Sequence, residues 1–122
     1  MKSLKTKKFN NFDFIVVDNP QNCYGQNSEY CEHFDVILKI LKLLKKSGIL
    51  IFNINKKPFN YQKFPNWIKR RNEFYKLEDT SELKIDWLLD FYKKFFLRNN
   101  KKMIFVLVCQ DKTWNTMIIC II

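Results

Sequence analysis

The hydrophobic residues of this chain change their spacing several times, and each change predicts a new element. Residues 14–17 form a continuous apolar, β-branched run, which is typical of a strand buried on both faces of a parallel sheet. From about Ser28 to Lys46 the spacing becomes helical, with lysines opposite the apolar face and Glu32 in the first turn, where the helix dipole favours an acid. Gly48 is expected to cap this helix, and residues 49–54 predict a second buried strand. The strand–helix–strand order predicts two parallel neighbours in one sheet.

The second half of the chain opens with a long irregular segment, residues 55–69, whose length is typical of a lid or a binding surface. A helix is expected from near Asn66 to Tyr75. The capping-box pattern of residues 79–82 predicts the start of another helix. Its apolar stripe, which we expect to pack on the sheet, consists of Leu83, Trp87, Leu88, Phe91 and Phe95. Residues 103–109 and 116–122 predict two strands, joined so briefly that they form an antiparallel hairpin.

Composition supports one folded domain. Residues 1–11 are a lysine-rich lead, and residues 12–122 are expected to form a single α/β domain. With 47% hydrophobic and 16% aromatic residues, the chain is not of the disordered class. Its net charge of +10, from 22 basic and 12 acidic residues, favours polyanions and above all nucleic acid. An AT-rich coding genome also raises the lysine content, so a merely solvated basic surface remains an alternative.

The four cysteines show neither the spacing of a zinc site nor that of a disulfide framework. They are Cys23, Cys31, Cys109 and Cys120, with no C-x-x-C pair. We therefore expect no metal site, and buried thiols in a reducing compartment, either the cytoplasm or an organellar matrix. The first ten residues are polar and basic, unlike a signal peptide. The apolar runs are far shorter than the roughly 20 residues that span a bilayer, so no membrane contact is expected.

Three short motifs, in this order, resemble those of a known enzyme family. Asp18-Asn19-Pro20-Gln21 follows the first strand and is similar to the D-P-P-Y or N-P-P-Y motif that closes the fourth strand of amino-methylating members. Residues 43–52 resemble the "L-L-K-x-G-G-x-L" entry to the family's fifth strand. The closing hairpin resembles its reversed sixth and seventh strands. From Phe12 onward, the chain therefore resembles the C-terminal half of the Rossmann-like class I methyltransferases that use S-adenosylmethionine.

The residues that would complete such an enzyme are missing from the chain. There is no G-x-G-x-G turn for the cofactor, and Gln21 and Asn22 replace the second proline and the aromatic residue of N-P-P-Y. The resemblance thus implies a partial Rossmann-like sheet, either part of a split enzyme or an inactive scaffold. S-adenosylmethionine would bind only with a completing partner, which would also cover the open sheet edge. The alternative is a non-catalytic structural or RNA-binding subunit of a larger assembly such as a ribosome.

The resemblance also assigns roles to the loop that follows the first strand. Its catalytic residues would be Asp18, Asn19 and Pro20, with the acid or the amide accepting a hydrogen bond from a target amino group. The proposed substrate-binding residues are Gln21, Tyr24 and His33. Simple turn chemistry also explains Asp18-Asn19-Pro20. His33 is a candidate general base or a ligand alongside a cysteine, or alternatively a hydrogen-bonded residue at the core boundary.

The stretch from Trp67 to Tyr75 combines aromatic residues with a pair of arginines. Arginine forks suit phosphate, and exposed aromatics stack on unpaired bases. Lys69, Arg70 and Arg71 are therefore candidate nucleic-acid-binding residues. In the alternative interpretation the aromatics pack in the core and the arginines are solvated.

Overall fold

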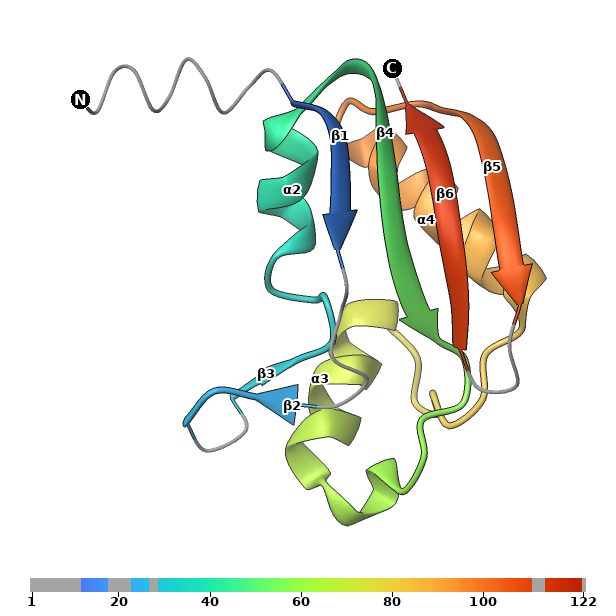
Figure 1. The fold of residues 1–122 in the computed structure, drawn as a ribbon. Coiled ribbons are helices and arrows are strands. Elements are labelled where there is room, and N and C mark those ends of the chain that lie inside the picture. Colours follow the sequence, from blue (N-terminus) through green and yellow to red (C-terminus); the bar gives the residue numbers. More distant parts are fainter. Residues whose placement is uncertain (1–11, 18–22, 27–28, 111–113, 122) are drawn as a thin grey trace.

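The computed structural model describes residues 12–17, 23–26, 29–110 and 114–121, which form a mixed α/β domain (Figure 1). The elements in chain order are β1 (Phe12–Val17), β2 (Cys23–Tyr24), β3 (Tyr30–Cys31), α2 (Ile37–Leu43), β4 (Leu44–Asn55), the 3-10 helix η2 (Tyr61–Lys63), α3 (Pro65–Tyr75), α4 (Ile85–Arg98), β5 (Met103–Gln110) and β6 (Trp114–Ile121).

The main sheet has four strands in the order β1-β4-β6-β5, and β2 pairs with β3 in a separate hairpin. β1 runs parallel to β4, whereas β6 is antiparallel to both β4 and β5. The last strand of the sequence therefore lies between β4 and β5, and it is the one strand of this sheet that runs in the reverse direction (Figure 1). The predicted parallel pair and the predicted closing hairpin are both confirmed.

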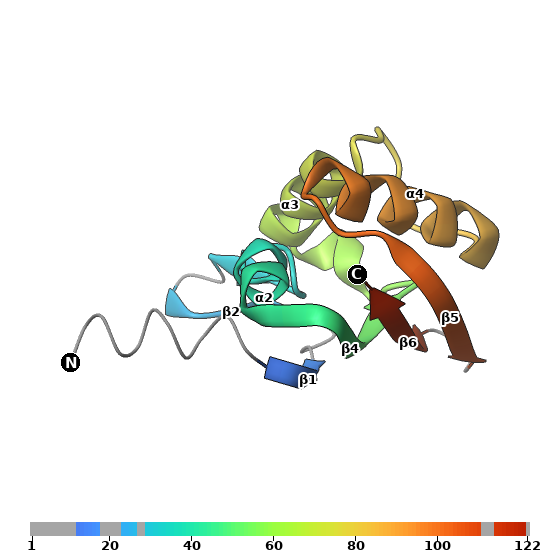
Figure 2. The ribbon, with the colours of Figure 1, turned by 90° about the horizontal axis from the view of Figure 1, so that it is seen from above.

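The helices cover one face of the main sheet. Figure 2 shows α2, α3 and α4 on the same side of the strands. Alternate residues of β4, namely Leu50, Phe52 and Ile54, are fully buried on this side. The register pairs Leu50 with Ile15 and Phe52 with Val17, so these β1 side chains face the same core. Burial of large apolar side chains between helices and sheet is the main source of stability for this layer.

α4 supplies the centre of the core, with aromatic side chains that the predicted stripe omits. Tyr92 and Phe96 are completely buried, whereas Trp87, which belongs to the stripe, is 36% exposed. The other members of the stripe are buried or packed against the core. The capping-box prediction is wrong, because the Asp79 carboxylate accepts a hydrogen bond from the nearby Ser81 amide at 2.9 Å and α4 begins only at Ile85.

The opposite face of β1 is bare, which corrects the expectation of a strand buried on both faces. Phe12, Phe14 and Val16 are 43%, 54% and 58% exposed. Phe14 and Val16 pair with Ile49 and Ile51 of β4, which are only partly buried. No helix of the described residues lies over this face (Figure 2). An apolar surface of this kind is typical of an interaction site.

The first predicted helix is much shorter than its periodicity suggests. α2 spans only Ile37–Leu43, and residues 32–36 form a turn instead. Glu32, expected in the first helical turn, has a positive φ of 50° and is buried. Gly48 lies inside β4 rather than at a helix cap, where a Cβ atom would approach the Lys45 carbonyl oxygen to 2.7 Å. Tertiary contacts of Glu32, described below, override the helical pattern.

Two of the four cysteines are joined by a disulfide bond, which the spacing argument excluded. Cys23 and Cys31 face each other across the β2–β3 hairpin. Their separation of eight residues becomes a direct pairing only through the hairpin register. Disulfide bonds persist mainly in oxidising compartments, so this one fits the expected reducing compartment poorly. Among the described residues, no helix has the length and apolar character needed to cross a membrane.

Candidate functional site

The loops that follow β1 and β4 leave the sheet at the same end, because the two strands are parallel. Ligands of open α/β sheets bind at this end. α3 and the β2–β3 hairpin lie beside it in Figure 1. The predicted catalytic residues Asp18, Asn19 and Pro20, together with Gln21, directly follow Val17 in the sequence. They lie outside the described residues, so their roles stay predictions.

A buried ion pair lies at this end of the sheet. Nη1 of Arg71 lies 2.9 Å from Oε2 and 3.2 Å from Oε1 of Glu32. The Trp67 indole nitrogen donates a further hydrogen bond to Glu32 at 2.8 Å. Burial raises the pKa of Glu32, and the charge of Arg71 and the hydrogen bond from Trp67 oppose this shift. The pair connects the turn after β3 to α3.

The remaining donors of Arg71 bind backbone carbonyl groups of two loops. Nε donates to the Thr80 carbonyl at 2.8 Å, and Nη2 donates to the carbonyls of Asn55 at 2.6 Å and Lys56 at 3.4 Å. The guanidinium also lies 5.3 Å from the centre of the Tyr75 ring. Arg71 is 0% exposed, so its guanidinium is enclosed by protein and is not a surface group that meets a phosphate. It holds the loop after β4 against α3.

His33 belongs to a buried chain of polar groups. Its Nε2 forms a hydrogen bond with the Tyr92 hydroxyl, which lies 2.8 Å from the Tyr75 hydroxyl. Burial, and then the nearby charge of Arg71, lower the pKa of His33 to about 3, so the ring is neutral at physiological pH. Burial also raises the pKa of both tyrosines. The imidazole packs against the rings of Phe34, Phe52 and Phe74.

The burial of His33 argues against direct contact between its side chain and a substrate. The side chain is 0% exposed, and a substrate in solvent does not reach it in this conformation. These surroundings are those of a hydrogen-bonded core residue, which is one of the alternatives that the sequence left open. The structure brings His33 together with Tyr92, a residue that no sequence motif had singled out.

Tyr24 lies in β2, on the hairpin that precedes this turn. The side chain is half-buried, and its ring lies 5.7 Å from the Tyr30 ring. Burial, and then the charge of Asp35, raise the pKa of the Tyr24 hydroxyl. The disulfide joins the two strands of the hairpin, and the buried Cys31 packs with Tyr61 and Trp67, which connects the hairpin to α3 and the loop before it. Tyr24 therefore lies in a hairpin that the disulfide stabilises, and in the sequence it follows the predicted catalytic loop closely.

Lys69 and Arg70 lie on the outer side of α3. Lys69 is exposed, and the Arg70 guanidinium pairs with Asp35, with side chains about one-third exposed. The hydrogen bond to Asp35 raises the pKa of Arg70. The three basic residues predicted to bind nucleic acid thus have three different surroundings, and only Lys69 has a charge that no described acid neutralises.

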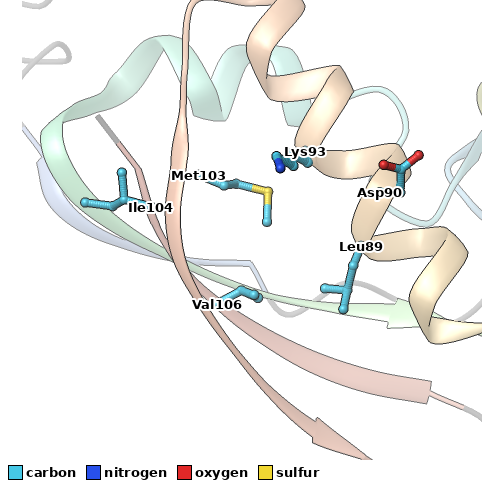
Figure 3. Close-up of a pocket in the computed structure, with 6 residues that line it drawn as sticks. All are labelled: Leu89, Asp90, Lys93, Met103, Ile104 and Val106. Carbon is cyan, nitrogen blue, oxygen red and sulfur yellow. The ribbon is translucent and has the colours of Figure 1, made fainter.

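A further candidate surface lies in the loop between β4 and α3. Phe59 is 79% exposed, and beside it is a cavity of about 490 Å³ lined in part by Lys57, Asn60 and Ser81. A larger cavity of about 560 Å³ lies between α4 and β5 (Figure 3). Its walls include Met103 at the start of β5, which is at the end of the sheet opposite to this site.

Among the residues that the structure describes, no group of three or more histidine, cysteine and acidic side chains is placed to hold a metal ion. The chain matches no protein-family model, and comparison with curated proteins and with solved structures found no match.

Sequence reasoning missed Glu32, Trp67 and Tyr92, which form the polar centre of the site. Each belongs to a helix-like or aromatic pattern that normally indicates surface or core. The one available signal was the pair Glu32-His33, two polar residues next to each other at the point where the apolar stripe begins. Their partners come from α3 and α4, so the site is created by tertiary packing.

Proposed function

We propose that this chain forms the target-binding half of a methyltransferase-like domain that acts on nucleic acid. In this proposal, strands outside these 122 residues continue the sheet at β1 and carry the glycine-rich turn for S-adenosylmethionine. The observations that carry it are that no described strand pairs with the outer edge of β1, and that Phe14 and Val16 are exposed on the face of the sheet beside that edge. Exposed apolar edge strands are normally covered by further strands or by a partner.

The sheet supports this proposal through its strand order. The resemblance makes β1, β4, β5 and β6 equivalent to the family's fourth, fifth, sixth and seventh strands. The observed order is then four-five-seven-six, with the seventh strand reversed. The edge that no described strand pairs with belongs to the fourth strand, where the family has its cofactor-binding strands. The mixed α/β fold alone is compatible with other functions, so the strand order and the unpaired edge of the described sheet are the specific support.

The residues of this chain do not fit S-adenosylmethionine by themselves. Only Gly25 and Gly48 are present in the sequence. Gly25 lies in the β2–β3 hairpin and Gly48 near the start of β4, so neither follows a parallel strand as a cofactor turn requires. The part of this chain in the reaction is to bind and orient the target. Asp18 or Asn19 would accept a hydrogen bond from the target amino group, and Pro20 would stiffen the loop.

Calorimetry with S-adenosylmethionine tests the proposal. The isolated chain is expected not to bind it, whereas the complex purified from native cells through a tag on this chain is expected to bind. Val16→Glu on the bare face should abolish both co-purification and binding. The matched control is Leu38→Glu, because Leu38 is similarly exposed on α2, away from that face. Binding by the isolated chain, or an unaffected Val16→Glu complex, would contradict the proposal.

A non-catalytic RNA-binding subunit is the second candidate function. It is favoured by the segment from Asn55 to Asn72, which contains no acid and four lysines that form no ion pair with a described residue. A complex that forms through the bare face but does not bind S-adenosylmethionine would support this candidate. Both functions require contact with nucleic acid.

A further inference from the structure

Phe59 is the most exposed large apolar side chain among the described residues, at 79%. Its neighbours in the sequence are anchored. Pro58 is buried, and Tyr61 is 8% exposed, with its ring packed edge-on against Trp67 at 6.1 Å. Asn60 adopts a left-handed conformation with φ of 59°, which turns the chain into η2. Burying these neighbours leaves the Phe59 ring in water, an arrangement that costs hydrophobic free energy unless a ligand covers the ring.

The base of this loop is held by hydrogen bonds from two other segments. Arg71 binds the Asn55 carbonyl at 2.6 Å, and the Lys56 carbonyl accepts a hydrogen bond from the Leu83 amide at 2.9 Å. Within the loop, the Lys63 amide donates to the Asn60 carbonyl at 3.1 Å. These hydrogen bonds therefore fix the conformation of the loop that carries Phe59, and the buried Arg71 connects this loop to α3. Preorganised supports of this kind reduce the entropy lost on binding.

The charged side chains on either side of Phe59 are positive and form no ion pair with a described residue. Lys57 and Lys63 are both exposed on either side of it in the sequence, and neither has an ion pair with a described residue. Arg70 and Arg71, in contrast, are neutralised by Asp35 and Glu32. The positive charge available to an external anion on this part of the surface therefore comes from lysines next to an exposed aromatic ring.

We propose that this surface binds single-stranded nucleic acid, with one unpaired base stacked on Phe59 and the flanking phosphates paired with Lys57 and Lys63. Aromatic side chains combined with a basic groove are the general means of binding single strands, because every base presents a flat π face. The adjoining cavity of about 490 Å³ is lined by Asn60, Gln62 and Ser81, which offer hydrogen bonds to the edges of a base. A duplex keeps its base faces stacked on one another and does not present them to such a ring.

The location connects this surface to the proposed function. Phe59 follows the carboxyl end of β4, and the predicted catalytic loop follows the carboxyl end of its parallel neighbour β1. The inference therefore names the substrate class as single-stranded nucleic acid. It rests on the nucleic-acid part of the proposed function and does not require methyl transfer. The methyltransferase proposal and this inference can therefore be contradicted independently.

Fluorescence anisotropy tests the inference on the full 122-residue chain with labelled oligouridylate and oligothymidylate of about 15 nucleotides and with a duplex of the same length. Phe59→Ala should weaken single-strand binding between about fivefold and a hundredfold, as expected for one lost stacking contact. Phe59→Trp should retain it. The control Leu97→Ala, at a half-exposed residue of α4, should change nothing. Comparison of the two single strands shows whether the ligand is RNA or DNA.

The lysines are tested by salt dependence. The variant Lys57→Ala/Lys63→Ala should reduce the slope of log affinity against log salt by about 1.4, since each phosphate contact with a single strand contributes about 0.7. Equal binding of single strands by wild type and Phe59→Ala would overturn the inference. Equal affinity for duplex and single strand, or no binding of any oligonucleotide, would overturn it as well. If S-adenosylmethionine does not bind the complex while Phe59→Ala still weakens the binding of single-stranded oligonucleotides, the methyltransferase proposal fails and this inference stands.

Discussion

Arg71 and Glu32 form an ion pair inside the protein, 39 residues apart in sequence, with side chains that are 0% and 2% exposed. The guanidinium makes further hydrogen bonds to the Thr80 and Asn55 carbonyls, and Trp67 binds the carboxylate. One arginine thus joins α3 to the turn after β3 and to the loops after β4 and α3. The position of the candidate nucleic-acid-binding loop depends on this contact.

Arg71→Met should lower the free energy of unfolding by about 3 to 5 kcal/mol, because it leaves the Glu32 carboxylate buried without its partner. Urea unfolding measures this loss. Lys69→Met is the control on the same helix and should change stability by less than about 0.5 kcal/mol, since Lys69 is exposed. A loss below about 1 kcal/mol for Arg71→Met would show that the ion pair is not enclosed as described.

His33 should make the protein sensitive to mild acid. Its pKa is about 3 in the folded state, below the unfolded value of 6.5, so the unfolded chain binds the proton more readily between these values. Stability is fully present above pH 6.5 and is lost as the pH falls. Between pH 7 and 4.5 the loss should be about 2 to 3 kcal/mol, at about 1.4 kcal/mol per unit.

Urea midpoints across this pH range measure the effect. His33→Gln should have a flatter profile, because it removes the titrating group and keeps a polar side chain beside Tyr92. If wild type and His33→Gln show the same slope, His33 is not the group that takes up the proton.

The Cys23–Cys31 disulfide should stabilise the hairpin that carries Tyr24. A bond that closes a loop of eight residues contributes about 2 to 3 kcal/mol in the chain-entropy description. Dithiothreitol should therefore lower the unfolding midpoint of the wild type and leave Cys23→Ser/Cys31→Ser unchanged. Alkylation of the denatured, unreduced chain gives an independent count, and labelling at both Cys23 and Cys31 would contradict the bond.

Two neighbouring valines of β1 test whether only one face of the sheet is buried. Val17 packs against the core, whereas Val16 is 58% exposed on the bare face. Val17→Thr should cost about 1 to 2 kcal/mol, because it places a hydroxyl among apolar groups, and Val16→Thr less than about 0.5 kcal/mol. Thermal unfolding of the two variants measures the difference. Equal losses would contradict the burial of only one face of β1.

The sequence predicted the elements whose pattern is local and uninterrupted. α3 matches its predicted range within one residue, and the closing hairpin and the parallel pair β1–β4 follow the predicted pairing. Periodicity reports such elements well, because each residue in them is chosen mainly by its immediate neighbours and by one buried face. The long loop after residue 55 was likewise recognised from sequence as a candidate binding surface.

Only the tertiary structure decided the rest. Nothing local distinguishes Val16 from Val17, and the helices that cover one face of the sheet make one exposed and the other part of the core. Glu32 leaves its helical pattern because Arg71 and Trp67 bind it inside the protein, and Cys31 finds Cys23 through the hairpin register. These contacts join residues 8 to 39 positions apart. Losing one partner of the ion pair would leave a buried charge uncompensated, which costs more than local preferences of a few tenths of a kcal/mol, such as those for a helical turn.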